Sequence, residues 1–483
     1  MGVTLYTSRV VLNALGISDF GIYNLIGGFI AMISFLNGAM AAATQRYLSY
    51  DIGTGDMVKL KKTFSATLTV HLGISLIVLL LAETVGLWYI NYRMIFPSER
   101  LYAVNVVYQL SLLTFLINII QVPYNALILA RERMHIYAFV SIIEVVLKLT
   151  IAFVLIKWGG DKLILFGGLS LLLAVIIRLV YQVYCKKSFP ESKYKFEYDP
   201  EYFKELISFS GWNMFGAMSL VLKNQGVNIV LNLFFGTVVN AAYGIAMQVQ
   251  SAVTQFVTNF QVALNPQIIQ NYASDQKEKS LKLIYMGGKF SFFIMLIIVA
   301  PLLENIEFVL VLWLKNVPEY TTIFLQISLI AILIDTISGP FMTGIQASGN
   351  IKTYQIVVGG INIISLPIIY YLLKSGANPS IPFLVLAMFS VCSFFLRLYF
   401  LGKSFVIDSF LFIKTILFRI IFISVIVYGI GTLLDIYFVE QGFFKLICTT
   451  IIFTICICLL VIFIGVDKNE RNLIKQLISS KFK

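Results

Sequence analysis

Long apolar runs, separated by short polar or Gly/Pro-containing segments, occupy nearly the whole chain. Most runs contain about 20 residues, which is enough for a helix to cross a bilayer core of roughly 30 Å. The pattern predicts an all-α polytopic membrane protein with about 14 transmembrane helices. The predicted ranges are 3–15, 20–45, 64–90, 104–129, 137–157, 162–184, 205–235, 240–268, 283–303, 320–346, 352–373, 381–401, 412–436 and 443–465.

The first predicted helix is truncated. Only about a dozen apolar residues precede Gly16, too few to span a bilayer unaided. A short, half-inserted helix is one explanation, but we expect that the true start lies upstream.

Composition agrees with a membrane protein, because 59% of the 483 residues are hydrophobic and only 12% are charged. Soluble domains carry about twice that share of charge. The net charge of +12 arises from alternate loops. One set, counted with Lys289 and Arg397, and the C-terminal tail hold 25 Lys and Arg residues, whereas the other set, counted with Lys445, holds 7. Positive loops face the cytoplasm, so we expect both termini there, and a membrane rather than nucleic acid explains the charge.

The chemistry-bearing residues do not form an enzyme pattern. The five cysteines and two histidines lack metal-ligand spacing, and no phosphate-binding loop or catalytic triad pattern is found. We therefore expect no enzyme activity, no cofactor, no metal site and no disulfide framework.

Weak internal similarity divides the chain into two halves. LNALG at 12–16 aligns with LNLFFG at 231–236, and NGAMAAATQRYLS at 37–49 aligns with QVALNPQIIQNYAS at 261–274. Such collinear matches predict that about six helices repeat in the same membrane orientation. The expected domains are an N-terminal bundle at 1–184, a cytoplasmic linker at 185–204, a C-terminal bundle at 205–401, and two extra helices with a basic tail at 402–483.

Polar residues within the predicted spans are the main candidates for a transport site, because they cost free energy unless they are paired or face water. The amides are Asn224, Asn228, Asn232, Gln248, Gln255 and Asn259, with Asn118, Gln121 and Asn125 in the span 104–129. They indicate a wet, amide-lined cavity. Amide contacts between packed helices are the alternative for part of this set.

Charged residues at membrane depth fall into two groups. Lys223 lies near mid-membrane and is a candidate for anion binding, whereas Glu144 and Lys148 have the i, i+4 spacing of an ion pair. Glu83 and Asp335 are isolated acids that could bind a coupling proton or Na⁺. A protonated, hydrogen-bonded carboxyl is the alternative for each.

The stretch LYTSRVVLNALGISDFGIYNLIGGFIAMISFLNGAMAAATQRYLSYDIGTGD, residues 5–56, resembles the start of bacterial polysaccharide (O-antigen-type) repeat-unit flippases. Their superfamily also contains multidrug and toxin extrusion antiporters and the lipid II flippase. The resemblance implies two six-helix bundles facing a central cavity, with two extra C-terminal helices. It also implies a substrate: an oligosaccharide linked through pyrophosphate to undecaprenol, flipped across the bacterial cytoplasmic membrane during synthesis of lipopolysaccharide or another surface polysaccharide.

A pyrophosphate needs cationic partners and a sugar needs amides and hydroxyls. The candidate ion-coupling residues are Glu83 and Asp335. The candidate substrate-binding residues are Arg9, Asn37, Gln45, Lys148, Lys223, Asn224, Asn228, Asn232, Gln248, Gln255 and Asn259. Expected partners are the lipid-linked substrate, a polysaccharide polymerase and glycosyltransferases. A drug or metabolite antiporter and a non-transporting assembly factor are the alternatives.

Overall fold

The computed structural model describes residues 2–31, 35–92, 96–196, 199–314, 316–405, 416–438 and 442–466. Within these ranges the chain is helical and contains no strand, which confirms the predicted fold class. Ten helical spans in the described ranges are long and apolar enough to cross a membrane, and further long helices accompany them. The chain is a multi-pass membrane protein.

Two compact units divide the chain. One contains Met1–Met218 and Ile269–Asp275, and the other contains Ser219–Ile268 and Gln276–Lys483. The long helix α8, Pro200–Ala273, contributes to both units.

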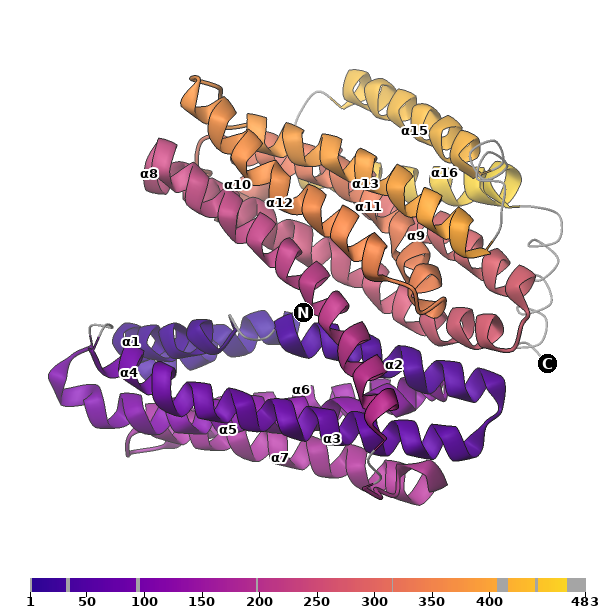
Figure 1. Ribbon diagram of the computed structural model, residues 1–483. Coiled ribbons are helices and arrows are strands. Elements are labelled where there is room, and N and C mark those ends of the chain that lie inside the picture. The colour runs from indigo at the N-terminus through magenta and orange to yellow at the C-terminus, as the bar shows by residue number, and fades with distance from the viewer. Residues whose placement is uncertain are drawn as a thin grey trace, which may run out of the picture. The chain divides into compact units, whose positions relative to one another are not determined.

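The N-terminal unit is built around α5 (Figure 1), which packs against α1, α2, α3, α6 and α7. The buried side chains of Val104, Val107 and Tyr108 on α5 form part of its core. The elements are α1 Gly2–Ala31, α2 Phe35–Thr54, α3 Met57–Leu81, η1 Ala82–Gly86, α4 Leu87–Tyr92, η2 Ser98–Arg100, α5 Leu101–Ala130, α6 Met134–Lys157, α7 Lys162–Ser188 and η3 Pro190–Ser192.

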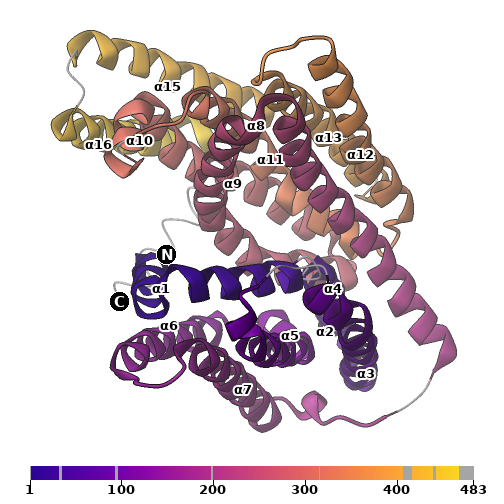
Figure 2. The same cartoon turned by 90° about the vertical axis from the view of Figure 1, so that its left-hand side faces the viewer.

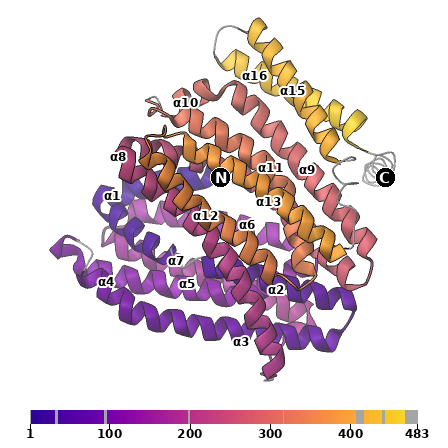
Figure 3. The ribbon, with the colours of Figure 1, turned by 45° about the horizontal axis from the view of Figure 1, so that its top comes forward.

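The C-terminal unit has α11 at its centre, packed between α9 and α13, as Figure 3 shows. Phe324, Leu329 and Ile332 of α11 lie in its core. The remaining elements are α9 Lys277–Glu304, α10 Ile306–Leu314, α11 Thr321–Ala347, α12 Lys352–Lys374, α13 Ile381–Phe405, α15 Phe418–Tyr437, α16 Phe443–Leu460 and η5 Val461–Gly465.

The two C-terminal helices α15 and α16 pack on each other and on α9 (Figure 2). On α16, Ile447, Ile451, Ile455 and Leu459 repeat every four residues and are about half exposed. A helix face of exposed isoleucine and leucine is suited to contact with lipid tails.

Glycine breaks two of the helices at matching places of the sequence repeat. Gly16 interrupts α1 with φ 80° and ψ 167°, and Gly236 interrupts α8 with φ 75° and ψ −162°. Only glycine adopts this region readily. The two residues end the aligned segments LNALG and LNLFFG, so the repeat predicted from sequence extends to the backbone conformation.

Some predicted boundaries were wrong. The second helix was expected to end at residue 45, but α2 continues to Thr54 because its polar last turns pack inside the unit, where Arg46 and Asp51 are buried. No helix was predicted for the segment that forms α10. The start of the predicted helix 412–436 lies partly outside the described residues.

Candidate functional site

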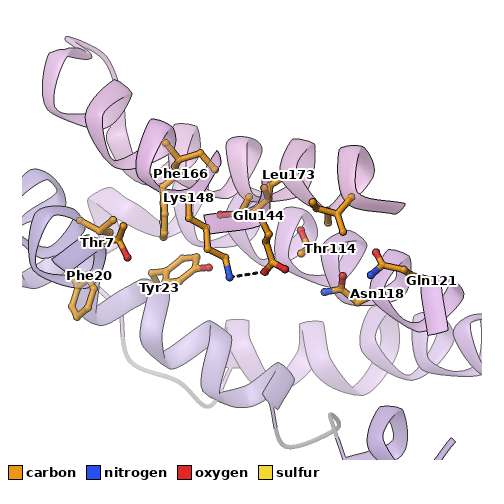
Figure 4. Close-up of a pocket in the computed structure, with 15 residues that line it drawn as sticks. Thr7, Phe20, Tyr23, Thr114, Asn118, Gln121, Glu144, Lys148, Phe166 and Leu173 are labelled. Carbon is orange, nitrogen blue, oxygen red and sulfur yellow. Dashed lines mark ion pairs between the residues drawn. The ribbon is translucent and has the colours of Figure 1, made fainter. Parts of the chain in front are cut away.

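A cavity of about 400 Å³ lies inside the N-terminal unit. Figure 4 shows that side chains from α1, α5, α6 and α7 converge on it. The residues that line it are Thr7, Val11, Phe20, Tyr23, Thr114, Asn118, Gln121, Glu144, Lys148, Ile151, Phe166, Ser170, Leu173, Ala174 and Ile177. Its wall combines apolar side chains with hydroxyl, amide and charged groups.

An ion pair occupies this cavity. Lys148 Nζ lies 2.6 Å from Glu144 Oε1, one helical turn away on α6, which confirms the pairing predicted from the i, i+4 spacing. Both side chains are close to half exposed, with 47% of Lys148 and 40% of Glu144 accessible. The pair is therefore open to a molecule that enters the cavity, rather than sealed between helices.

Polar groups of α5 extend along one wall of the cavity. Thr114, Asn118 and Gln121 follow a spacing of four and three residues, which places them on one face of the helix. The Thr114 hydroxyl donates to the Leu110 carbonyl oxygen at 2.8 Å, whereas Gln121 Oε1 is buried without a hydrogen-bond partner. A buried amide oxygen without a partner costs free energy, so Gln121 has acceptor capacity available for a ligand hydroxyl.

Aromatic rings form the opposite side. The Tyr23 ring of α1 packs on the Phe166 ring of α7, with their centroids 4.6 Å apart. Because Tyr23 lies after the break at Gly16 and Thr7 lies before it, both parts of α1 reach the cavity.

A second charged cluster lies in the C-terminal unit. Arg397 Nη1 on α13 is 3.8 Å from Asp335 Oδ1 on α11, and the Ser390 hydroxyl donates to Asp335 Oδ2 at 3.0 Å. Lys223 on α8 interacts electrostatically with both Asp335 and Arg397. The cluster joins two residues that the sequence had suggested for separate roles, Lys223 for substrate and Asp335 for coupling.

Arg397 was missed as a site residue, because the sequence interpretation grouped it with the cytoplasmic positive charges. Its position inside the predicted span 381–401 was the signal that could have identified it.

The amides of α8 are only partly brought together. Gln255 Nε2 donates to Asn259 Oδ1 at 3.0 Å, and Gln248 is exposed. Asn224 accepts a hydrogen bond from the Tyr243 hydroxyl at 2.9 Å through its backbone carbonyl oxygen, not through its side chain. Among the others, Asn228 is half-buried and Asn232 is exposed.

Three remaining candidates lie in the first two helices. Asn37 and Gln45 are on α2, where Asn37 Oδ1 and Gln45 Nε2 are buried without hydrogen-bond partners. Arg9 lies on α1, and its side chain is outside the described residues. Glu83, on the π-helical turn η1, accepts a hydrogen bond from Gln109 Nε2 at 3.2 Å.

Comparison with protein families gives one match, in which the model described as "Polysaccharide biosynthesis protein" covers residues 2–272. No curated protein matches the chain.

Three solved structures with a similar fold are distant in sequence. A MATE transporter in complex with MaD3S has a TM-score of 0.70 at 14% identity, covering 83% of this chain and 93% of its own. An outward-facing multidrug resistance MATE family transporter of the MOP superfamily has a TM-score of 0.66 at 13% identity, covering 83% and 91%. A MOP superfamily transporter from Pyrococcus furiosus, whose description reports a binding pocket of reverse polarity, has a TM-score of 0.69 at 13% identity, covering 84% and 92%.

Proposed function

Since the chain belongs to the polysaccharide biosynthesis protein family, we propose that it flips lipid-linked oligosaccharides across the bacterial cytoplasmic membrane. It has the fold of the MOP-superfamily transporters. The proposed substrate is an oligosaccharide joined through pyrophosphate to undecaprenol, which moves from the cytoplasmic to the outer leaflet by alternating access for surface polysaccharide synthesis.

The cavity of the N-terminal unit supports this proposal most directly. Lys148 offers a cation to phosphate oxygens, and Thr114, Asn118 and Gln121 offer partners to sugar hydroxyls. An apolar drug would leave such buried amides unpaired, at a cost in affinity. The proposed binding set also contains Arg9, Asn37, Gln45, Lys223 and the amides of α8.

Both termini are proposed to lie in the cytoplasm, because the basic loops then lie on that side. A polysaccharide polymerase and glycosyltransferases are the proposed partners, since they would consume and supply the flipped unit. Glu83 is proposed as a residue for ion coupling.

A cation-coupled drug or metabolite antiporter is the second candidate. Glu144 favours it, because an exposed carboxylate in a cavity can attract a cationic ligand. The pairing of Glu144 with Lys148 weakens that attraction, since the cavity carries the cation as well. A non-transporting assembly factor would not need an accessible ion pair inside a cavity.

Flipping by the purified protein in proteoliposomes, with an undecaprenyl-pyrophosphate-linked oligosaccharide as substrate, tests the proposal. Lys148→Gln should lower the flipping rate about tenfold or more, since a charge-assisted contact is lost. Lys157→Gln, at the exposed end of the same helix, is the matched control and should flip normally. If the wild type flips no lipid-linked oligosaccharide but exports cationic drugs, the result would support the antiporter instead.

A further inference from the structure

The charges of the C-terminal cluster do not balance. Lys223 and Arg397 are two cations, and among the residues that the structure describes Asp335 is the carboxylate that interacts with both. An ionised Asp335 leaves one positive charge in excess, and a neutral residue at position 335 would leave two.

The contact between Arg397 and Asp335 is also loose. The 3.8 Å between Nη1 and Oδ1 exceeds the 2.7–2.9 Å typical of a charge-assisted hydrogen bond. Only 15% of the Arg397 side chain is accessible, and its Nε is buried without a hydrogen-bond partner. A guanidinium binds planar carboxylates and phosphates with two donors, so Arg397 keeps donors that Asp335 does not use.

Asp335 is held from the other side by Ser390. The Ser390 hydroxyl donates to Oδ2, which keeps the carboxylate within reach of Arg397, and 38% of the Asp335 side chain stays accessible. The carboxylate is thus accessible, and an anion of higher charge can displace it from Arg397.

We propose that Lys223 and Arg397 form a binding site for a phosphate or pyrophosphate group, and that Asp335 is its internal counter-ion. The proposal builds on the transport function above and gives Asp335 a role different from coupling. In the empty state Asp335 partly neutralises the two cations. An incoming anionic group displaces Asp335 from them and takes up the donors of Arg397, and on release Asp335 returns.

A counter-ion of this kind limits affinity and so assists release. A site with two uncompensated cations in a low-dielectric region would hold a pyrophosphate too tightly to pass it on. The competition therefore predicts that removing the negative charge at position 335 should strengthen anion binding. A coupling acid or a purely structural acid would not have this effect.

Inorganic pyrophosphate binding to the full-length protein in lipid nanodiscs, measured by calorimetry, tests the proposal. Asp335→Asn keeps the shape of the side chain and should tighten binding about threefold to tenfold, the effect of one partly screened charge. Lys223→Gln and Arg397→Gln should each weaken binding by a similar factor. Glu307→Gln removes an exposed carboxylate from α10 of the same unit and should leave binding unchanged.

Equal or weaker binding by a folded Asp335→Asn variant would overturn the counter-ion role, even if Lys223→Gln weakens binding. Tighter binding by both Asp335→Asn and Glu307→Gln would indicate a general effect of net charge and would also overturn it. Thermal unfolding of each variant confirms that it is folded.

Flipping of the lipid-linked oligosaccharide by the same preparations separates the two proposals. If pyrophosphate binding responds as expected but the wild type flips no lipid-linked substrate, the anion site stands and the transport function fails. If the wild type flips the substrate but binds no pyrophosphate, the transport function stands and the site fails.

Discussion

Lys62 on α3 forms an ion pair with Asp199, 137 residues further along the chain, with 2.5 Å between Nζ and Oδ2. Asp199 also caps α8, because its Oδ1 accepts from the backbone N–H groups of Glu201 and Tyr202. The hydrogen bonds from Lys62 and Tyr202 hold the pKa of Asp199 below its ordinary value. The start of α8 is thus held near the start of α3 within the N-terminal unit.

This contact should respond to acid. A carboxylate whose pKa is lowered in the folded state stabilises that state above its unfolded pKa of about 3.9, and the stabilisation is lost as pH falls through the folded value. We expect the protection of the first-turn amides of α8 against hydrogen exchange, corrected for the intrinsic exchange rate at each pH, to be high at pH 7 and to fall below about pH 4. Asp199→Asn keeps the cap but loses the charge, so its exchange should already be faster at pH 7.

Asp56→Asn is a matched control, since Asp56 caps α3 in the same way and accepts from the Lys59 N–H. It should leave exchange at the start of α8 unchanged. Slow exchange of the Asp199→Asn variant at pH 7, equal to the wild type, would contradict the role of the ion pair.

The linker is also anchored by Arg131, whose Nε and Nη2 both donate to Oε1 of Glu191, with 2.8 Å between Nε and Oε1. Glu191 is buried, so Arg131→Gln would leave its carboxylate without the cation. Removing one partner of a buried pair should lower the free energy of unfolding by about 3 kcal/mol, the lower end of the usual range, because 24% of the Arg131 side chain is accessible. Thermal or denaturant unfolding in detergent measures this loss.

Arg133→Gln changes an exposed arginine two residues further on and should cost little. The double variant Arg131→Gln/Glu191→Gln should recover part of the loss, because the uncompensated charge is gone. No recovery would mean that Arg131 acts through packing alone.

Gly53 of α2 allows a close approach of the backbone at Gln270, which belongs to the same unit. A Cβ at position 53 would lie 2.4 Å from the Gln270 carbonyl oxygen. Backbone gives way less easily than a flexible side chain, so Gly53→Ala should lower the free energy of unfolding by about 1–3 kcal/mol. Gly38→Ala on the same helix meets no atom within 4 Å and should be neutral or slightly stabilising in the same unfolding assay. Equal effects of the two variants would rule out the close contact.

The sequence predicted the helical fold well because a span is a local property: its length and apolarity can be read from one run of residues. The pair of Glu144 and Lys148 was predictable for the same reason, since their spacing lies within one helix. Contacts between different helices were not predictable in this way. Nothing local indicates that Asp335 of α11 faces Arg397 of α13, or that Gln109 donates to Glu83.

Charges near helix ends misled the sequence interpretation. Lys445 was counted with an outer loop, yet it is buried on α16 and pairs with Asp435 of α15, with 2.8 Å between Nζ and Oδ1. Lys289 was counted with a cytoplasmic loop, yet only 2% of it is exposed on α9. Burial depends on the neighbouring helices, which a single run of residues does not reveal.

The break at Gly236 allows a test of backbone conformation without steric clash. A Cβ added there would meet no atom within 4 Å, so any effect of Gly236→Ala arises from the backbone angles alone. Holding alanine at φ 75° should cost about 1–3 kcal/mol. The variant either keeps the break and is destabilised by the strained backbone, or it loses the break and α8 straightens. Either response should lower both the unfolding temperature and the flipping rate.

Gly244→Ala, on the same helix and also free of close neighbours, has ordinary helical geometry and should be as stable as the wild type or slightly more so. Gly16→Ala should behave like Gly236→Ala, because Gly16 also has positive φ and open space around it. If the two break positions carry equivalent roles in the duplicated halves, both variants should slow flipping while Gly244→Ala does not. A full flipping rate for Gly236→Ala, with an unchanged unfolding temperature, would show that the break is not required for the structure or for transport.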